Sequence, residues 1–326
     1  MYSKSAFGIT LSLFSWLVHA QAEVIAFPEK SVRIVLPFAR GGSTDNFTRA
    51  MQPKLEAVLG QKILLENVLG GVGGSRGPEV AAAAAPDGYT LLVATVGNMA
   101  LLPATYPAYG IQPLRDLAPV TMLADLPNVL VAHRAVPATT YAQLLALAKA
   151  RPGQITFPRF GIQSIHGIEF AEIIKAHGIQ LKEIANNGGS GGAMTAIQTG
   201  YLDLVMTTAP FVLPHVRSGA IRALAIAASA RSAAFPDIPT MPEVGVPSLS
   251  VGSWMGIFVP AATPQPILNK LHAAAMIAAG HADVKNNANE YGMVVTFSKS
   301  PDAFKAFVAS ETARLQAIVS GLRTKQ

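Results

Sequence analysis

Residues 32–45 read VRIVLPFARGGSTD, and this stretch decides the fold. The apolar run 32–38 predicts a strand that is buried on both faces, because it lacks the alternation of a half-exposed strand. A short loop with two glycines follows, and apolar residues at helical spacing then predict a helix over 45–59. Buried strands that alternate with helices are typical of an α/β fold with a mostly parallel sheet covered on both faces.

The same alternation continues along the chain and then restarts, which indicates two lobes. Apolar runs at 63–67 and 89–95 predict two more strands of the first lobe, and 129–132 opens a second series of short strands and helices. A chain of 326 residues fits about two domains of roughly 150 residues each. We expect the chain to cross between the lobes twice. The predicted division is 23–125 for the first part of lobe 1, 126–243 for lobe 2 and 244–326 for the second part of lobe 1.

The N-terminal residues 1–22, MYSKSAFGITLSLFSWLVHAQA, have the form of a cleavable signal peptide. Lys4 gives a positive start, a short apolar stretch covers 6–18, and Ala20-Gln21-Ala22 has the small-x-small pattern of a cleavage site. We therefore expect export to the periplasm of a Gram-negative bacterium. The chain contains no cysteine, which suits that compartment and excludes a disulfide framework, thiolate metal sites and a cysteine nucleophile.

The composition offers few other partners. The 25 basic and 19 acidic residues give a net charge of +6, and no Lys/Arg-rich run indicates nucleic-acid binding. The seven histidines are scattered without metal-ligand spacing, so no metal is predicted. The glycine run at 71–76 misses the third glycine of a dinucleotide loop, so no cofactor is expected. Beyond the N-terminus no apolar run reaches the ~18 residues of a membrane span.

Glycine-rich loops in front of helices are the most informative functional feature. Loops at 40–45, 69–75, 95–98 and 186–192 share this design, and 160–164 is a weaker fifth case. A helix N-terminus has unpaired N–H groups and a partial positive charge, and glycine lets a ligand approach the backbone closely. Several such loops that converge from two lobes would form an anion site without any catalytic group.

Five stretches occur in the order of a known family's signature blocks. They are 37–45 (PFARGGSTD), 66–77 (ENVLGGVGGSRG), 85–91 (APDGYTL), 212–225 (VLPHVRSGAIRALA) and 236–245 (PDIPTMPEVG). The chain resembles the Bug family, the periplasmic substrate-binding proteins of tripartite tricarboxylate transporters. The resemblance covers essentially the whole sequence after the predicted signal peptide.

The resemblance implies a type II-like, Venus-flytrap binding protein that closes on a small organic carboxylate in the cleft between its lobes. It implies a monomer that delivers this ligand to integral membrane transporter subunits in a transient contact, without catalysis, metal or cofactor. One carboxylate would be held by main-chain N–H groups of the glycine loops. The predicted ligand-binding residues are Ala39, Arg40, Gly41, Gly42, Ser43, Thr44, Gly74, Ser75, Thr95, Gly97, Asn98, Arg159, Ser164, His166, Gly189, Ser190 and Thr208.

The sequence departs from the family pattern at two arginines. Arg40 stands where a proline is usual, and Arg159 lies where a loop of small residues is usual. One hypothesis is that both face the cleft and clamp a second carboxylate. The alternative is that both lie in solvent, which is the ordinary environment of arginine.

Two other functions compete with transport. Residues 188–192 (GGSGG) fit the G-x-S-x-G pattern of a serine esterase with Ser190 as nucleophile, but 73–77 (GGSRG) fit it too, so the motif is weak. Alternatively, lobe closure could signal the presence of ligand to a membrane histidine kinase. The same fold would serve transport and sensing, so sequence does not separate them.

Overall fold

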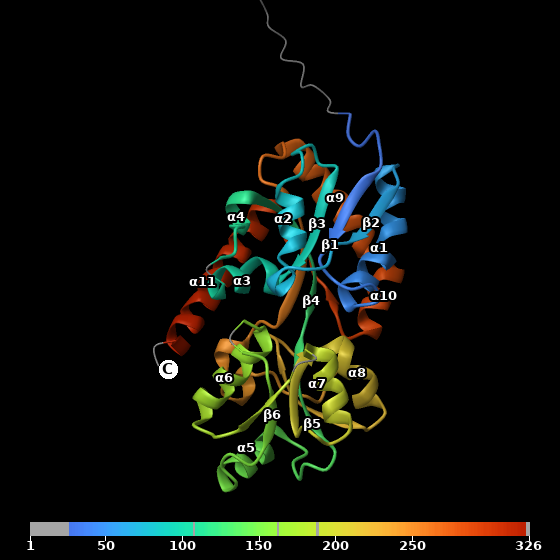
Figure 1. Cartoon of the computed structure of the whole chain (residues 1–326). Coiled ribbons are helices and arrows are strands. Elements are labelled where there is room, and N and C mark those ends of the chain that lie inside the picture. Colours follow the sequence, from blue (N-terminus) through green and yellow to red (C-terminus); the bar gives the residue numbers. More distant parts are fainter. Residues whose placement is uncertain (1–25, 107, 162, 187–188, 324–326) are drawn as a thin grey trace, which may run out of the picture.

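The computed structural model describes residues 26–106, 108–161, 163–186 and 189–323, so the predicted signal peptide lies outside the described residues. Two lobes lie one above the other in Figure 1, and they are joined near the end of β4. This arrangement confirms the predicted two-lobed α/β fold. Within the described ranges, no helix has the length and apolar character needed to span a bilayer.

The larger lobe is built on a six-stranded mixed sheet. Its strands, in spatial order, are β11 (Val294–Val295), β4 (Leu117–Leu126), β10 (Ser253–Pro260), β3 (Thr90–Thr95), β1 (Val32–Leu36) and β2 (Ile63–Asn67). β1 is parallel to β2 and β3, whereas β10 is antiparallel to β3 and β4, and β11 is antiparallel to β4. The prediction of a mostly parallel sheet is therefore wrong here, because the chain returns from the other lobe through β10 in the opposite direction.

Helices cover both faces of this sheet, as the all-buried strands require. One face carries α1 and α9, where Phe47, Met51 and Leu271 join the core; the other carries α2 and α11, where Trp254 and Phe304 are buried. The helices of this lobe are α1 (Ser43–Leu59), α2 (Arg76–Ala82), α3 (Leu102–Thr105), α4 (Pro113–Asp116), α9 (Gln265–Gly280), α10 (Ala282–Glu290) and α11 (Pro301–Arg323), with the short turns η1 (Val72–Gly74) and η2 (Gly97–Leu101).

The smaller lobe has a central strand flanked by two antiparallel neighbours, and a separate parallel pair. The three-stranded sheet has the order β8 (Leu204–Thr208), β5 (Asn128–His133), β9 (Ile221–Ala227), and the pair is β6 (Thr156–Arg159) with β7 (Lys182–Ala185). Helices α5 (Tyr141–Ala150) and α6 (Ile165–His177) pack on one face of the three-stranded sheet, and α7 (Gly189–Gln198) and α8 (Ala209–Arg217) pack on the other.

The two passages between the lobes lie side by side. The first is Pro127, between the last residue of β4 and the first of β5. The second ends at Gly252, where an added Cβ would lie 2.8 Å from the carbonyl oxygen of Ala227 and 2.9 Å from the amide nitrogen of Asn128. Between β9 and β10 run the turns η3 (Pro242–Val244) and η4 (Pro247–Leu249). The division at 243/244 remains a prediction, and Leu249 beyond it packs in the core of the smaller lobe.

Candidate functional site

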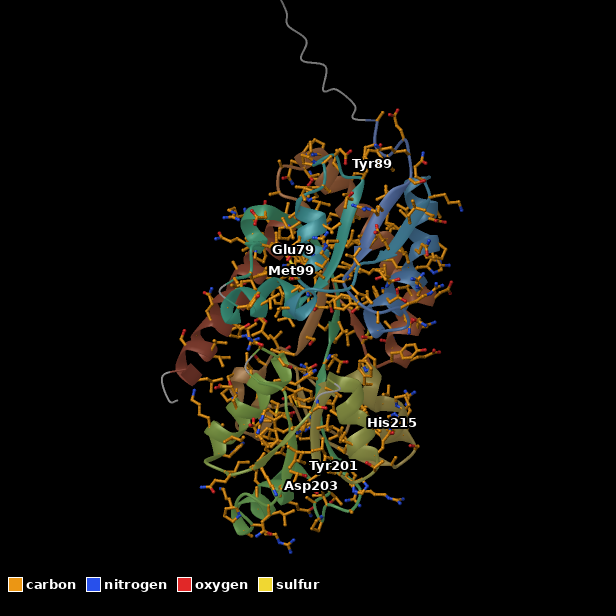
Figure 2. The ribbon with its side chains drawn as sticks, in the orientation of Figure 1. Glu79, Tyr89, Met99, Tyr201, Asp203 and His215 are labelled. Carbon is orange, nitrogen blue, oxygen red and sulfur yellow. The ribbon has the colours of Figure 1, made fainter. Side chains whose placement is uncertain are left out.

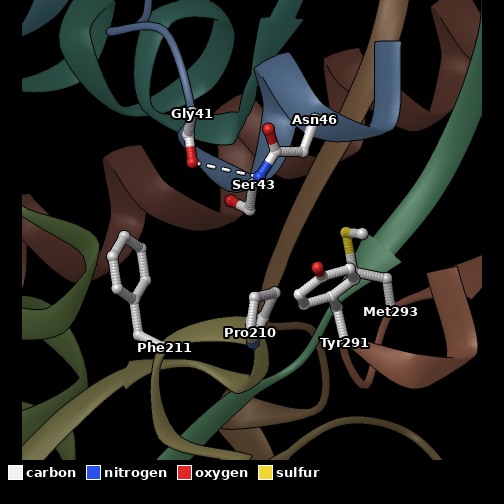
Figure 3. A pocket seen from close by; sticks show the side chains of 7 residues that line it. All are labelled: Gly41, Ser43, Asn46, Pro210, Phe211, Tyr291 and Met293. Carbon is white, nitrogen blue, oxygen red and sulfur yellow. Dashed lines mark hydrogen bonds between the residues drawn. The ribbon is translucent and has the colours of Figure 1, made fainter. Parts of the chain in front are cut away.

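A cavity of about 120 Å³ lies between the lobes. Figure 3 shows its walls: the loop before α1 and the first turn of α1 on one side, the start of α8 on the other, and the segment after α10 beside them. The lining residues are Gly41, Ser43, Asn46, Pro210, Phe211, Tyr291 and Met293. Gly41 and Ser43 are among the residues predicted from sequence to bind ligand.

The first turn of α1 presents unpaired backbone donors to this cavity. Its N-cap, Gly42, has extended backbone angles and no side chain caps the helix. The amides of Gly41 and Gly42 donate to the Asp45 carboxylate (2.9 Å) and to the Ala39 carbonyl oxygen (3.2 Å), so neither is free for a ligand. The amides of Ser43 and Thr44 have no acceptor among the described residues. The donors for an anion are therefore the two residues after the glycines rather than the glycines themselves.

Asp45 fixes the loop that carries these donors. Its side chain is fully buried and accepts hydrogen bonds from Arg49 (2.8 and 2.9 Å) and Asn67 (2.8 Å), besides that from Gly41. Burial raises the pKa of Asp45, but the hydrogen bonds from Arg49, Asn67 and the Gly41 amide outweigh it and lower the pKa to about 2. Asp45 thus remains ionised and anchors the loop to the end of β2.

The start of α8 faces the cavity from the smaller lobe. Thr208 is the N-cap and its side chain makes no capping hydrogen bond. Its hydroxyl oxygen is buried and has no partner within the described part of the chain. Pro210 has no N–H, and Phe211 lies in the first turn of α8, where backbone N–H groups have no i−4 partner inside the helix. Two uncapped helix starts from opposite lobes therefore open on one cavity.

The loops after β1, β2 and β3 meet within the larger lobe, where Asn98 joins them. Its amide nitrogen donates to the Gly73 carbonyl oxygen (2.7 Å), and its side-chain oxygen accepts from the Thr95 hydroxyl (3.4 Å). A Cβ added at Gly74 would lie 3.1 Å from that amide nitrogen and 3.2 Å from the carbonyl oxygen of Pro37. Both polar ends of the Asn98 side chain are therefore used inside the lobe, where they position the loops.

A buried polar chain lies on the smaller lobe beside the crossing. Glu169 is fully buried, and its Oε2 lies 3.2 Å from the His166 Nδ1. Its Oε1 accepts a hydrogen bond from the side-chain nitrogen (Nδ2) of Asn128 at 2.7 Å. The Asn128 side-chain oxygen is buried without a partner among the described residues, and Asn128 pairs with Thr208 across β5 and β8. His166 and Thr208 were among the residues predicted from sequence, whereas Glu169 and Asn128 were not. The spacing of three residues between His166 and Glu169 was the available signal.

None of the remaining predicted residues is among the described residues that line this cavity. Arg159 pairs with Glu183 on the neighbouring strand (3.3 Å), with both side chains largely exposed, so its charge already has a partner. Arg40 is exposed, Ser75 is buried before α2, Gly97 begins η2, Ser164 is the N-cap of α6 and Gly189 begins α7. Residues 187–188 and the Ser190 side chain lie outside the described parts.

The described residues contain no group of three or more His, Asp or Glu side chains that could hold a metal.

The family described as "Tripartite tricarboxylate transporter family receptor" matches residues 47–323. This chain is a member of that family. The family membership confirms the resemblance seen in the sequence blocks, and it is a family of receptors rather than of enzymes.

Individual members extend the comparison over nearly the whole chain. Protein BugT of Bordetella pertussis is 31% identical over 305 residues, covering 93% of this chain and 92% of BugT. The structure of MatC from Rhodopseudomonas palustris with bound malate superposes with a TM-score of 0.76, at 31% identity, over 90% of this chain and 100% of MatC. The periplasmic binding protein BugD superposes with the same TM-score at 27% identity, over 90% of this chain and 98% of BugD.

Proposed function

We propose that this protein is a periplasmic solute-binding protein that captures a small organic carboxylate between its lobes and delivers it to a membrane transporter of the tripartite tricarboxylate type. The observation that carries the proposal is the pair of uncapped helix starts, α1 and α8, on one cavity between the lobes. Each start offers unpaired N–H groups and a partial positive charge to an anion.

A carboxylate placed there would bind both lobes at once. It would accept from the Ser43 and Thr44 amides on the larger lobe and from the Phe211 amide on the smaller one. A hydrogen bond to a charged group contributes about 1.5–3 kcal/mol net. Because the Phe211 bond can form only when the lobes are close, the ligand would stabilise the closed form, which is the condition for ligand-driven closure.

The location and the ligand class are supported by the relatives. MatC holds malate in its structure and BugD is a periplasmic protein. The predicted signal peptide at 1–22 accounts for export. In this proposal the other predicted residues (Gly74, Ser75, Thr95, Gly97, Ser164, His166, Gly189, Ser190 and Thr208) line the approach around the carboxylate, and closure creates the surface that the transporter subunits recognise transiently.

One substitution tests the amide donors directly. Ser43→Pro removes the N–H at the first residue of α1, where proline is tolerated, and the preceding Gly42 already has the extended angles (φ −69°, ψ 163°) that proline requires. Ser43→Ala is the matched control, because it removes the hydroxyl and keeps the N–H. Calorimetric titration with mono-, di- and tricarboxylates should identify at least one ligand. Ser43→Pro should bind that ligand at least about tenfold more weakly than Ser43→Ala does, because a charge-assisted hydrogen bond contributes at least ~1.5 kcal/mol. Equal affinities in the two variants would refute the proposed position of the carboxylate at the start of α1.

A further inference from the structure

The wall of the cavity opposite the start of α1 is apolar. Phe211 of α8 is 41% exposed and Tyr291, which follows α10, is 39% exposed. Pro210 and Met293 complete this wall, and Figure 3 shows the two rings on either side of Pro210. Exposed aromatic rings around a small concave space with a few polar groups are the usual composition of a small-molecule site.

Among the described residues, none that lines the cavity has a charged side chain. None of its seven lining residues is Asp, Glu, Lys, Arg or His. Its one amide side chain, Asn46, donates to the Gly41 carbonyl oxygen at 3.0 Å and so is already engaged (Figure 3). A second carboxylate placed in the cavity would lose its hydration without gaining a cationic partner, which is strongly unfavourable. The backbone donors of the helix starts can therefore satisfy one carboxylate, and the rest of the space suits carbon.

We propose that the ligand is a monocarboxylate with a compact apolar body, whose carboxylate lies at the helix starts and whose body lies between Phe211 and Tyr291. This inference rests on the proposed function, because it describes the ligand of the same site. Each ring belongs to a different lobe, so an apolar body between them is buried only when the lobes close. The apolar contact thereby adds to the closing force that the carboxylate supplies.

The first test compares ligands of matched charge or matched size. Titration calorimetry would use acetate, benzoate, cyclohexanecarboxylate, succinate and malate. We expect benzoate or cyclohexanecarboxylate to bind at least tenfold more tightly than acetate and more tightly than either dicarboxylate. Succinate or malate binding more tightly than both ring acids would overturn the inference and leave the proposed function standing. If no acid binds at all, the proposed function itself is wrong.

The second test removes the rings. Phe211→Ala and Tyr291→Ala should each weaken the preferred ring acid about tenfold and weaken acetate clearly less, because acetate has no apolar body to contact the rings. Tyr291→Phe should retain ring-acid binding, because it keeps the ring and removes only the hydroxyl. Tyr201→Ala is the matched control: Tyr201 is 67% exposed on the smaller lobe and, as Figure 2 shows, lies far from the larger lobe. Equal weakening of acetate and ring acid in Phe211→Ala would overturn the inference, since the ring would then act on the site as a whole.

Discussion

Replacing Asp45 with asparagine tests how the binding loop is held. Its pKa is lowered from the ordinary 3.8 to about 2 in the folded protein. At about 1.36 kcal/mol for each pKa unit, the difference of about 1.8 corresponds to roughly 2.4 kcal/mol of folding free energy. Because the folded pKa is the lower one, this stabilisation is present above pH ~4 and is lost as the pH falls through about 2. Asparagine cannot carry the charge, so the variant lacks this stabilisation at every pH.

Urea unfolding of the protein and of Asp45→Asn over pH 2–7 measures this contribution. Carboxylates shared by the two proteins cancel in the difference between their unfolding free energies. That difference should be about 2 kcal/mol at pH 7 and should shrink steadily below pH ~4, since protonation removes the same interaction from the unmodified protein. Carboxylate affinity should fall as well, because Asp45 holds the Gly41 amide and thereby the loop before Ser43.

Asp302 provides the control for this experiment. It is also an acid in the first turn of a helix, α11, but it is exposed. Asp302→Asn should change the unfolding free energy by less than about 1 kcal/mol, the size of an exposed helix-dipole effect. A difference for Asp45→Asn that stays constant across the pH range would refute the reasoning, because the loss would then come from packing rather than from the ionised carboxylate.

Three further substitutions test the loops and the crossing. Gly74→Ala should destabilise the protein more than Gly219→Ala in thermal unfolding, because both have φ near +75° but only at Gly74 would the Cβ meet another residue, Asn98 at 3.1 Å. Gly252→Ala should cost about 1–3 kcal/mol in urea unfolding, since its Cβ would press on backbone atoms of both passages between the lobes. Thr208→Val should leave stability unchanged or raise it, because it removes a buried hydroxyl without a partner, yet should weaken ligand binding in calorimetry.

The strongly periodic elements could be predicted from the sequence. β2 has the predicted bounds, and the helix predicted over 45–59 is α1, which begins two residues earlier, because local apolar spacing determines both. The long strand β4 was missed, since Pro119 and Asp125 interrupt its apolar run. Proline is tolerated there because β11 pairs only with residues 124–125 of β4, so the Pro119 end has β10 as its only neighbour. The direction of β10 could not be predicted from the sequence either. Helices bury both faces of β10, so this antiparallel strand is as apolar as a parallel strand would be.

The candidate site was predictable where it depends on local order and not where it depends on distant segments. A glycine loop before a helix is visible in sequence, so Gly41 and Ser43 were named. Phe211 and Tyr291 carry no motif, and 80 residues of chain separate them, so only the fold places their rings at one cavity. The Gly41 and Gly42 amides already have acceptors inside the loop, the Asp45 carboxylate and the Ala39 carbonyl oxygen, which no spacing rule reveals.

The distribution of donors between the lobes decides how firmly a ligand can close the protein. Contacts to the larger lobe alone would bind the open and closed forms equally and would shift nothing. A shift from 1% to 99% closed requires about 5.5 kcal/mol of preference for the closed form. The Phe211 amide can supply about 1.5–3 kcal/mol, so a second donor from the smaller lobe is needed. The unpartnered Thr208 hydroxyl, at the cap of the same helix, is the nearest group that could supply it. Burial of an apolar ligand body against Phe211 would add the remainder, so the ring and the hydroxyl of one helix start set the closing force.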